Sequence, residues 1–300
     1  RAEYTNDETT TIEIGTGMHA TLTMEMLRVA ASMKIKIYPL AIESTLSAMG
    51  RAVDNATRLV TAAGGKVFRG FSTDPNTAKH VRTHLGADAP HLLISENIGN
   101  FFSANGYPYI YSEALRTGII GPDTVSIPRE GATLWRPASF QLIRPKPGTT
   151  VHWGPDVIYL SALTDKPLAK QWGLMSHYTF DGDPSESQRQ LHQTRRSTVT
   201  ITDTQHLDCL QMTTWVKLGP TPGQPYDPLT RDCPDLAEAT DTNVRSATVH
   251  SAHGYDGHTS EWQNPLVLLR PGIDAEIGDT ISTVSTVQNG MRQQYNLIIT

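Results

Sequence analysis

The chain has 300 residues, of which 38% are hydrophobic and 18% are charged, and its formal net charge is −5. This composition is typical of a globular protein with a substantial core, organised as one large domain or two, and it excludes a disordered chain. The small negative charge provides no general attraction for nucleic acid, and no apolar run is long enough for a membrane-spanning helix. We therefore expect neither a membrane nor a nucleic acid as a direct partner. Cys209 and Cys233 are too few for a disulfide framework, so we expect an intracellular protein, cytoplasmic or organellar.

The most informative stretch, Thr11–Glu43, predicts a strand, a glycine turn, a helix and a second strand. Thr11–Ile14 is short, apolar and β-branched, as a buried parallel strand should be. Gly15 and Gly17 follow it, and their lack of a Cβ lets the backbone approach a ligand closely. The helix predicted over Ala20–Met33 would direct its N-terminal N–H groups toward that turn.

The second strand of this stretch is predicted over Lys34–Leu40, and it leads to Glu43 at the same end of the sheet as the glycine turn. A carboxylate in this place can accept both hydroxyl groups of a ribose, which favours a cofactor that contains adenosine. The full dinucleotide-binding pattern requires a third glycine, and His19 stands where it would fall. Many α/β proteins contain a Gly-x-Gly turn and a surface Glu, so the spacing alone leaves both interpretations open.

Strands continue to alternate with helices up to about Ile143, which favours a mostly parallel, doubly wound sheet. In such sheets, ligands bind outside the carboxyl ends of the strands. Asp74 follows the third predicted strand and Glu96 follows the fourth, so we expect both acids at the edge that carries the glycine turn. The other elements predicted here are a helix over Leu46–Ala63 and strands over Lys66–Phe71, His91–Ser95, Thr124–Pro128 and Thr133–Ile143.

The second half of the chain, beyond Pro145, has a different character. Proline and glycine separate short β-prone runs and helical periodicity is weak, which predicts an antiparallel β-domain, either a barrel or a sandwich. Gly219–Asp241 is rich in Pro, Gly and acids and indicates a surface excursion. We therefore expect an α/β domain over residues 1–145 and a β-domain over residues 146–300. The predicted strands are Val157–Leu160, Tyr178–Phe180, Thr198–Ile201, Leu210–Leu218, Asn243–His250, Leu266–Leu269, Thr280–Val287 and Tyr295–Ile299.

An adenosyl-binding α/β half followed by a β-barrel half resembles the protein arginine methyltransferases, and several motifs match this family by position. Ile12–Gly17 resembles the family's first motif, and Leu40–Glu43 resembles its ribose-binding strand end. Ile94–Phe101 resembles the Ser-Glu-Leu-Leu-Gly-Ser-Phe loop that opens the family's double-Glu hairpin. The details are most similar to the type II, symmetric-dimethylating branch, including a dimerisation-arm-like segment over Pro155–Phe180. Ser260-Glu261-Trp262 falls where type II enzymes carry Phe-Ser-Trp.

The resemblance implies a site for S-adenosylmethionine and for an acceptor arginine. In the family, two carboxylates grip the guanidinium and direct its nitrogen at the methyl group. Glu96 matches the first acid, and Asn105 occupies the position of the second, nine residues on. Glu261, in the barrel loop that faces the pocket in relatives, is a candidate for the missing carboxylate. The cofactor-binding residues implied by the resemblance are Gly15, Gly17, Glu43 and Asp74.

Two functions are consistent with these motifs. One is a degenerate relative, catalytically silent or weak, that acts as a regulatory or scaffold subunit, which Asn105 and His19 favour. The other is an active S-adenosylmethionine-dependent protein arginine N-methyltransferase. A methyltransferase acting on RNA or small molecules is a third option, which the barrel half and the Glu96 loop oppose. We expect a protein partner, in a homodimer or in a hetero-oligomer with a related chain or a larger assembly.

No metal site is predicted. His250, His253 and His258 cluster in a glycine-rich loop with Asp256. Their spacing is loose for zinc ligands, and no cysteine is near them in the sequence.

Overall fold

The computed structural model describes residues 9–44, 50–139, 144–145, 151–153, 157–160, 163–164, 168–218, 248–250, 264–290 and 293–300. The chain forms two compact units whose segments alternate along the sequence. The first, which we call the α/β unit, comprises the described residues within Arg1–Asn97, Gly106–Arg129 and Phe180–Gln188. The second, the β unit, comprises the described residues within Ile98–Asn105, Glu130–Thr179 and Arg189–Thr300.

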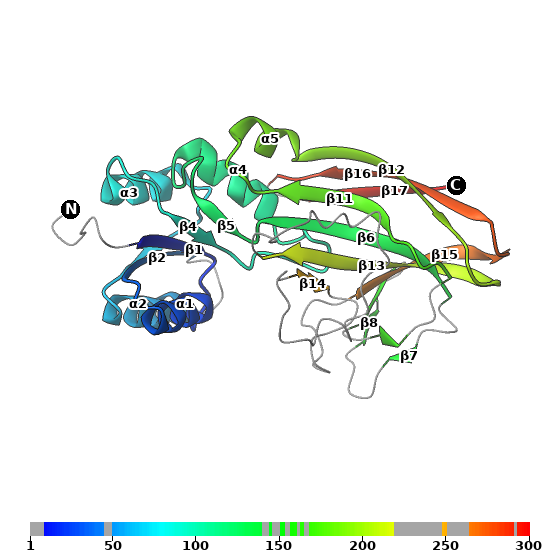
Figure 1. Ribbon diagram of the computed structural model, residues 1–300, viewed down its shortest axis with the longest axis horizontal. Helices are drawn as coiled ribbons and strands as arrows, with labels where there is room; N and C mark the ends of the chain where they lie inside the picture. Colours follow the sequence, from blue (N-terminus) through cyan, green and yellow to red (C-terminus); the bar gives the residue numbers. More distant parts are fainter. Residues whose placement is uncertain are drawn as a thin grey trace. The chain divides into compact units, whose positions relative to one another are not determined.

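The α/β unit is built on a parallel sheet. Its strands are β1 (Thr9–Ile14), β2 (Ile37–Glu43), β3 (Lys66–Arg69), β4 (Leu92–Ile94) and β5 (Val125–Ile127). The helices that connect them are α1 (Thr21–Ser32), α2 (Gly50–Ala62), α3 (Pro75–Leu85) and α4 (Tyr107–Thr117), and the short α5 (Pro184–Arg189) comes later in the chain. The strand order is β3-β2-β1-β4-β5, so the direction of winding reverses at β1. As a result α1 and α2 cover one face of the sheet, and α3 and α4 cover the other (Figure 1).

Burial explains why these segments form the centre of the unit. Ile12 in β1, Leu40 in β2 and Leu93 in β4 are completely buried, as expected for parallel strands covered by helices on both faces. Val53, Ala56 and Val60 recur at helical spacing and place one apolar face of α2 on the sheet. The predicted Rossmann-like half is therefore confirmed.

The second strand lies further along the chain than predicted. The sequence pattern placed it over Lys34–Leu40, whereas β2 runs over Ile37–Glu43. Lys34 has a left-handed φ of 59°, so the chain is still turning there and extends only afterwards. The shift moves Glu43 from a loop to the last position of the strand, where it is 9% exposed.

The β unit is antiparallel. Its largest sheet has the order β11-β6-β13-β15-β9-β8, with β14 also paired to β13. These strands are β6 (Glu130–Ala138), β8 (Val151–Trp153), β9 (Val157–Leu160), β11 (Gly173–Thr179), β13 (Gln205–Lys217), β14 (Thr248–His250) and β15 (Asn264–Ala275). A second sheet has the order β12-β16-β17, from β12 (His192–Thr200), β16 (Thr280–Gln288) and β17 (Gln294–Ile299). A short pair joins β7 (Arg144–Pro145) and β10 (Leu163–Thr164).

The strand predicted over Thr133–Ile143 was expected to continue the parallel sheet. The corresponding strand, β6, belongs to the antiparallel sheet of the β unit instead. It pairs antiparallel with β13 from Cys209↔Ala138 to Lys217↔Glu130, and with β11 on its other side. Residues 140–143 lie outside the described residues. A run of apolar residues predicts a strand but does not identify its sheet, which explains this difference.

The two main sheets of the β unit share one core. Trp135, Met175 and Leu210 come from the larger sheet, and Val199 and Val287 come from the smaller one. These side chains are at most 2% exposed. Packing between two sheet faces gives the barrel-like half that was predicted, and Figure 1 shows β12, β16 and β17 lying over β11 and β6.

Candidate functional site

The glycine turn lies between β1 and α1, at the carboxyl end of the central strand. Gly15 and Gly17 have φ values of 79° and 63°, a left-handed conformation that side chains with a Cβ rarely adopt. The N–H of Gly15 donates to the carbonyl of Ile42 in β2, at 2.9 Å. The turn is thereby attached to the neighbouring strand.

Glu43 reaches the glycine turn from the end of β2. Its Oε2 accepts a hydrogen bond from the N–H of Gly17 at 2.6 Å, and its Oε1 accepts one from the N–H of Ser44 at 3.0 Å. The structure thus brings together two of the predicted cofactor-binding residues: the backbone N–H of Gly17 and the carboxylate of Glu43. This pairing fixes the carboxylate beside a backbone surface that carries no Cβ.

The carboxyl end of β4 anchors the start of the same turn. Ser95 Oγ and Asn97 Nδ2 each donate to the carbonyl of Ile14 at 2.8 Å, and Asn97 Nδ2 also donates to Ser95 Oγ at 2.8 Å. The side chain of Glu96, between them in sequence, is exposed. The backbone on either side of the predicted acceptor-binding acid is therefore held in place.

Asp74 follows β3 and has a structural role of its own. Its side chain caps the N-terminus of α3, accepting the N–H of Asn76 at 2.7 Å, and Pro75 occupies the first turn. Because β3, β2, β1 and β4 are adjacent and parallel, their carboxyl ends lie at one edge of the sheet. Glu43 is the last residue of β2, and Asp74, the glycine turn and Glu96 come after the ends of β3, β1 and β4. Their assignment to a cofactor and an acceptor remains a prediction.

Glu13 is a site residue that the sequence analysis missed. It lies in β1, is 3% exposed, and accepts hydrogen bonds from both the N–H and the hydroxyl of Thr23 in the first turn of α1. Burial raises the pKa of Glu13; hydrogen bonds from Thr23 oppose this effect, and the charge of Glu43 adds to it. The signal was an acid inside an otherwise buried strand, directly before the glycine turn. Glu13 therefore ties the first turn of α1 to β1, the two elements that the glycine turn connects.

The segment Ile98–Asn105 is built into the β unit by aromatic contacts. Phe101 stacks on Tyr295 and Phe102 on Tyr178, with ring centroids 5.0 and 5.6 Å apart. Ser103 Oγ lies 2.9 Å from the hydroxyl of Tyr295. The segment is thus a fixed part of the β unit.

Asn105 closes this segment with its own side chain. Its Nδ2 donates to the carbonyl of Ile98 at 2.9 Å, across the turn. An ionised Asp or Glu at this position has no N–H group and could not donate to the carbonyl of Ile98. The hydrogen bond that closes the turn therefore depends on the amide of Asn105. The other candidate acid, Glu261, lies outside the described residues.

The described residues contain no group of three His, Cys, Asp or Glu side chains that could hold a metal ion. The histidines His253 and His258 lie outside the described part of the chain. Among the described helices, none combines the length and the apolarity required to span a membrane.

At the edge of the α/β sheet, the turn containing Gly15 and Gly17 lies beside the nearly buried carboxylate of Glu43. This combination is suited to the ribose of a nucleoside. The chain thus combines a Rossmann-like half, built on a parallel sheet, with a barrel-like half built from antiparallel sheets. No protein-family model and no curated protein matches the sequence. Among solved structures, the chain is similar to one in the Trypanosoma brucei PRMT1 enzyme–prozyme heterotetrameric complex with AdoHcy, at 9% identity and a TM-score of 0.60. The match covers 97% of this chain and 83% of the other, and it establishes a shared fold.

Proposed function

We propose that this chain is a protein arginine methyltransferase-like protein of the type II kind that has lost its second catalytic acid and acts as a regulatory or scaffold subunit. The observation that carries this proposal is the side chain of Asn105, which donates to the carbonyl of Ile98 at the position where the family carries an acid. In this structure the side chain of Asn105 stabilises its own turn through this hydrogen bond.

The chemistry of the acceptor explains why this substitution matters. An arginine side chain is a delocalised cation that presents only hydrogen-bond donors. A neutral amide whose NH₂ group is directed at a backbone carbonyl offers it at most one uncharged acceptor. Loss of one such electrostatic group typically lowers the catalytic rate by about 10²–10³. With Glu96 alone, methyl transfer is expected to be weak or absent.

The cofactor half of the site is better preserved in this proposal. A carboxylate has about four acceptor positions, and the N–H groups of Gly17 and Ser44 use two of those of Glu43. Two remain for the hydroxyl groups of a ribose. We propose that Gly15, Gly17, Glu43 and Asp74 hold S-adenosylmethionine or S-adenosylhomocysteine, and the AdoHcy in the complex of the similar structure supports this assignment.

A protein partner is part of the proposal. The similar structure comes from an enzyme–prozyme heterotetramer. By analogy, we propose that this chain assembles with itself or with a related, catalytically complete chain. Light scattering at micromolar concentration tests self-association, and a monomer at all concentrations would leave only the heteromeric form.

The test of the silent state is transfer of a tritiated methyl group to arginine-rich peptides. The wild-type chain should transfer little or none, and Asn105→Glu should transfer measurably more. Asn105→Gln is the matched control, because it has the length of Glu without its charge. Robust transfer by the wild-type chain would contradict the proposal.

The second candidate function is an active S-adenosylmethionine-dependent protein arginine N-methyltransferase. It is favoured by the anchored backbone on either side of Glu96, where Ser95 and Asn97 fix the end of β4. In that case Glu261 would supply the second carboxylate. Wild-type activity that Glu261→Gln abolishes would support this alternative over the first.

A further inference from the structure

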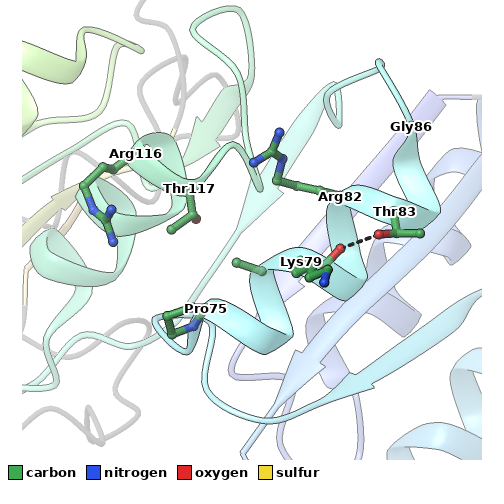
Figure 2. Close-up of a pocket in the computed structure, with 8 residues that line it drawn as sticks. Pro75, Lys79, Arg82, Thr83, Gly86, Arg116 and Thr117 are labelled. Carbon is green, nitrogen blue, oxygen red and sulfur yellow. Dashed lines mark hydrogen bonds between the residues drawn. The ribbon is translucent and has the colours of Figure 1, made fainter.

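A cationic cleft lies between α3 and α4, away from the glycine turn. It has a volume of about 560 Å³, within the usual size range of small-ligand sites. Figure 2 shows Lys79 and Arg82 extending from α3 and Arg116 from α4. The complete lining is Pro75, Ala78, Lys79, Arg82, Thr83, Gly86, Arg116 and Thr117.

The charge of this cleft is one-sided. Three of the lining residues are cations and none is an acid, although the chain as a whole has a net charge of −5. Arg116 forms an ion pair with Glu113 at 2.6 Å. Lys79 and Arg82 form no ion pair within the described part of the chain. Two of the three positive charges are therefore available to a ligand.

The side chain of Arg82 lies beside the C-terminal end of α4. A Cβ at Gly118, the C-cap of α4 with a φ of 73°, would lie 3.4 Å from Arg82 Nε, which is about an ordinary contact distance. Arg82 itself is exposed, so its guanidinium can be reached from solvent. Basic residues in the last turns of α3 and α4 also offset the helix dipoles, which is the purely structural explanation of this cluster.

The remaining lining indicates what kind of ligand fits. The hydroxyl of Thr83 donates to the carbonyl of Lys79 and that of Thr117 to the carbonyl of Glu113, so their donors are already used. The lining includes no aromatic ring that could stack on a nucleobase. The cleft therefore offers concentrated positive charge without base recognition. We propose that it binds a small polyanion carrying two or more phosphoryl groups.

Calorimetric titration of the full chain with inorganic tripolyphosphate tests this proposal. We expect saturable binding with one site per chain, which weakens as salt concentration rises. Lys79→Ala and Arg82→Gln should each weaken the affinity by on the order of tenfold, because each removes a charge-assisted contact. Arg58→Gln is the matched control, since Arg58 is an exposed arginine on α2, at the opposite face of the sheet.

Three results would overturn the proposal: no saturable binding at millimolar tripolyphosphate, an equal loss of affinity in Arg58→Gln, or unchanged affinity in both cleft variants. The proposal would also be overturned, in favour of a nucleic-acid site, if single-stranded RNA bound more tightly than tripolyphosphate, with an affinity that rises with RNA length. This binding would have to be lost in Lys79→Ala and Arg82→Gln. The proposal does not depend on the glycine turn. S-adenosylhomocysteine binding should be unchanged in Lys79→Ala, so failure here leaves the proposed function intact.

Discussion

The amide of Asn97 lies directly over Gly15, with Nδ2 only 2.5 Å from the position that a Cβ on Gly15 would occupy. The same amide donates to the carbonyl of Ile14, so it cannot move away without losing a hydrogen bond. Gly15 is thus required by a neighbour as well as by its own backbone conformation. Gly17, two residues later, has no atom within 4 Å of its virtual Cβ.

This difference predicts unequal effects for the two glycines. Gly17→Ala should cost only the left-handed backbone strain, about 1–2 kcal/mol of the free energy of unfolding. Gly15→Ala should cost more, by at least about 1 kcal/mol, because the steric conflict with Asn97 is added. Urea denaturation of both variants measures the difference. The opposite order of stability would show that Asn97 does not restrict the turn.

The support that Thr23 gives to Glu13 predicts a second pair of variants. Thr23→Val removes a hydroxyl that donates to a buried carboxylate, and should lower the free energy of unfolding by about 1–3 kcal/mol. Thr11→Val is the matched control: Thr11 is 1% exposed in β1, and its hydroxyl has no hydrogen-bond partner within the described structure. It should be neutral or stabilising. Equal losses in both variants would argue against the role of Glu13.

Glu130 predicts a pH dependence of stability in the β unit. His177 Nε2 lies 3.5 Å from one carboxylate oxygen and Lys217 Nζ lies 2.6 Å from the other. The interaction with His177, followed by that with Lys217, lowers the pKa of Glu130 to about 2 from an ordinary value of 4.5. The folded state therefore holds this carboxylate ionised more strongly than the unfolded state does. Its contribution is fully present above pH 4.5 and is lost as the pH falls toward 2.

The corresponding variant is Glu130→Gln. It should lower the free energy of unfolding at neutral pH by about 3 kcal/mol, because Lys217 is left nearly buried without its counter-charge. It should also reduce the loss of stability between pH 5.5 and pH 3.5 relative to wild type, as measured by urea denaturation at both values. An unchanged pH dependence would show that other groups dominate acid unfolding.

The hydrogen bond from Asn105 to Ile98 predicts that substitutions of Asn105 change the stability of the fold, whether or not they change activity. Asn105→Asp places a carboxylate oxygen against the carbonyl of Ile98 and should cost about 1–3 kcal/mol. Asn105→Ser removes the hydrogen bond without adding repulsion, so its cost should be smaller. Thermal denaturation ranks the three proteins, and an Asp variant as stable as wild type would disprove the closing role of the amide.

The sequence was sufficient for the general architecture because its strongest patterns are local. Thr11–Ile14, the two glycines and the helix after them follow directly from side-chain type, and the structure places α1 over Thr21–Ser32, close to the predicted range. The helical stripe through Val53, Ala56 and Val60 was equally clear. These elements depend little on distant contacts.

The features that sequence could not supply depend on partners elsewhere in the chain. β6 belongs to the antiparallel sheet because it pairs with β13, which lies far along the chain. For example, Arg136 in β6 pairs with Gln211 in β13, 75 residues later. The hydrogen bond of Asn105 requires the backbone of Ile98 to face it, which no spacing reveals. Asp74 did carry a local signal, since an Asp before Pro75 is typical of a helix N-cap.

The central claim is that the carboxyl edge of the α/β sheet holds a nucleoside through Glu43, and titration of S-adenosylhomocysteine tests it most directly. We predict saturable binding by the wild-type chain and by Glu25→Gln, an exposed surface control on α1. Glu43→Gln keeps an acceptor for Gly17 but loses the charge, and should bind on the order of 10–100-fold more weakly. Absence of heat at millimolar ligand, or equal affinity in Glu43→Gln, would contradict the account.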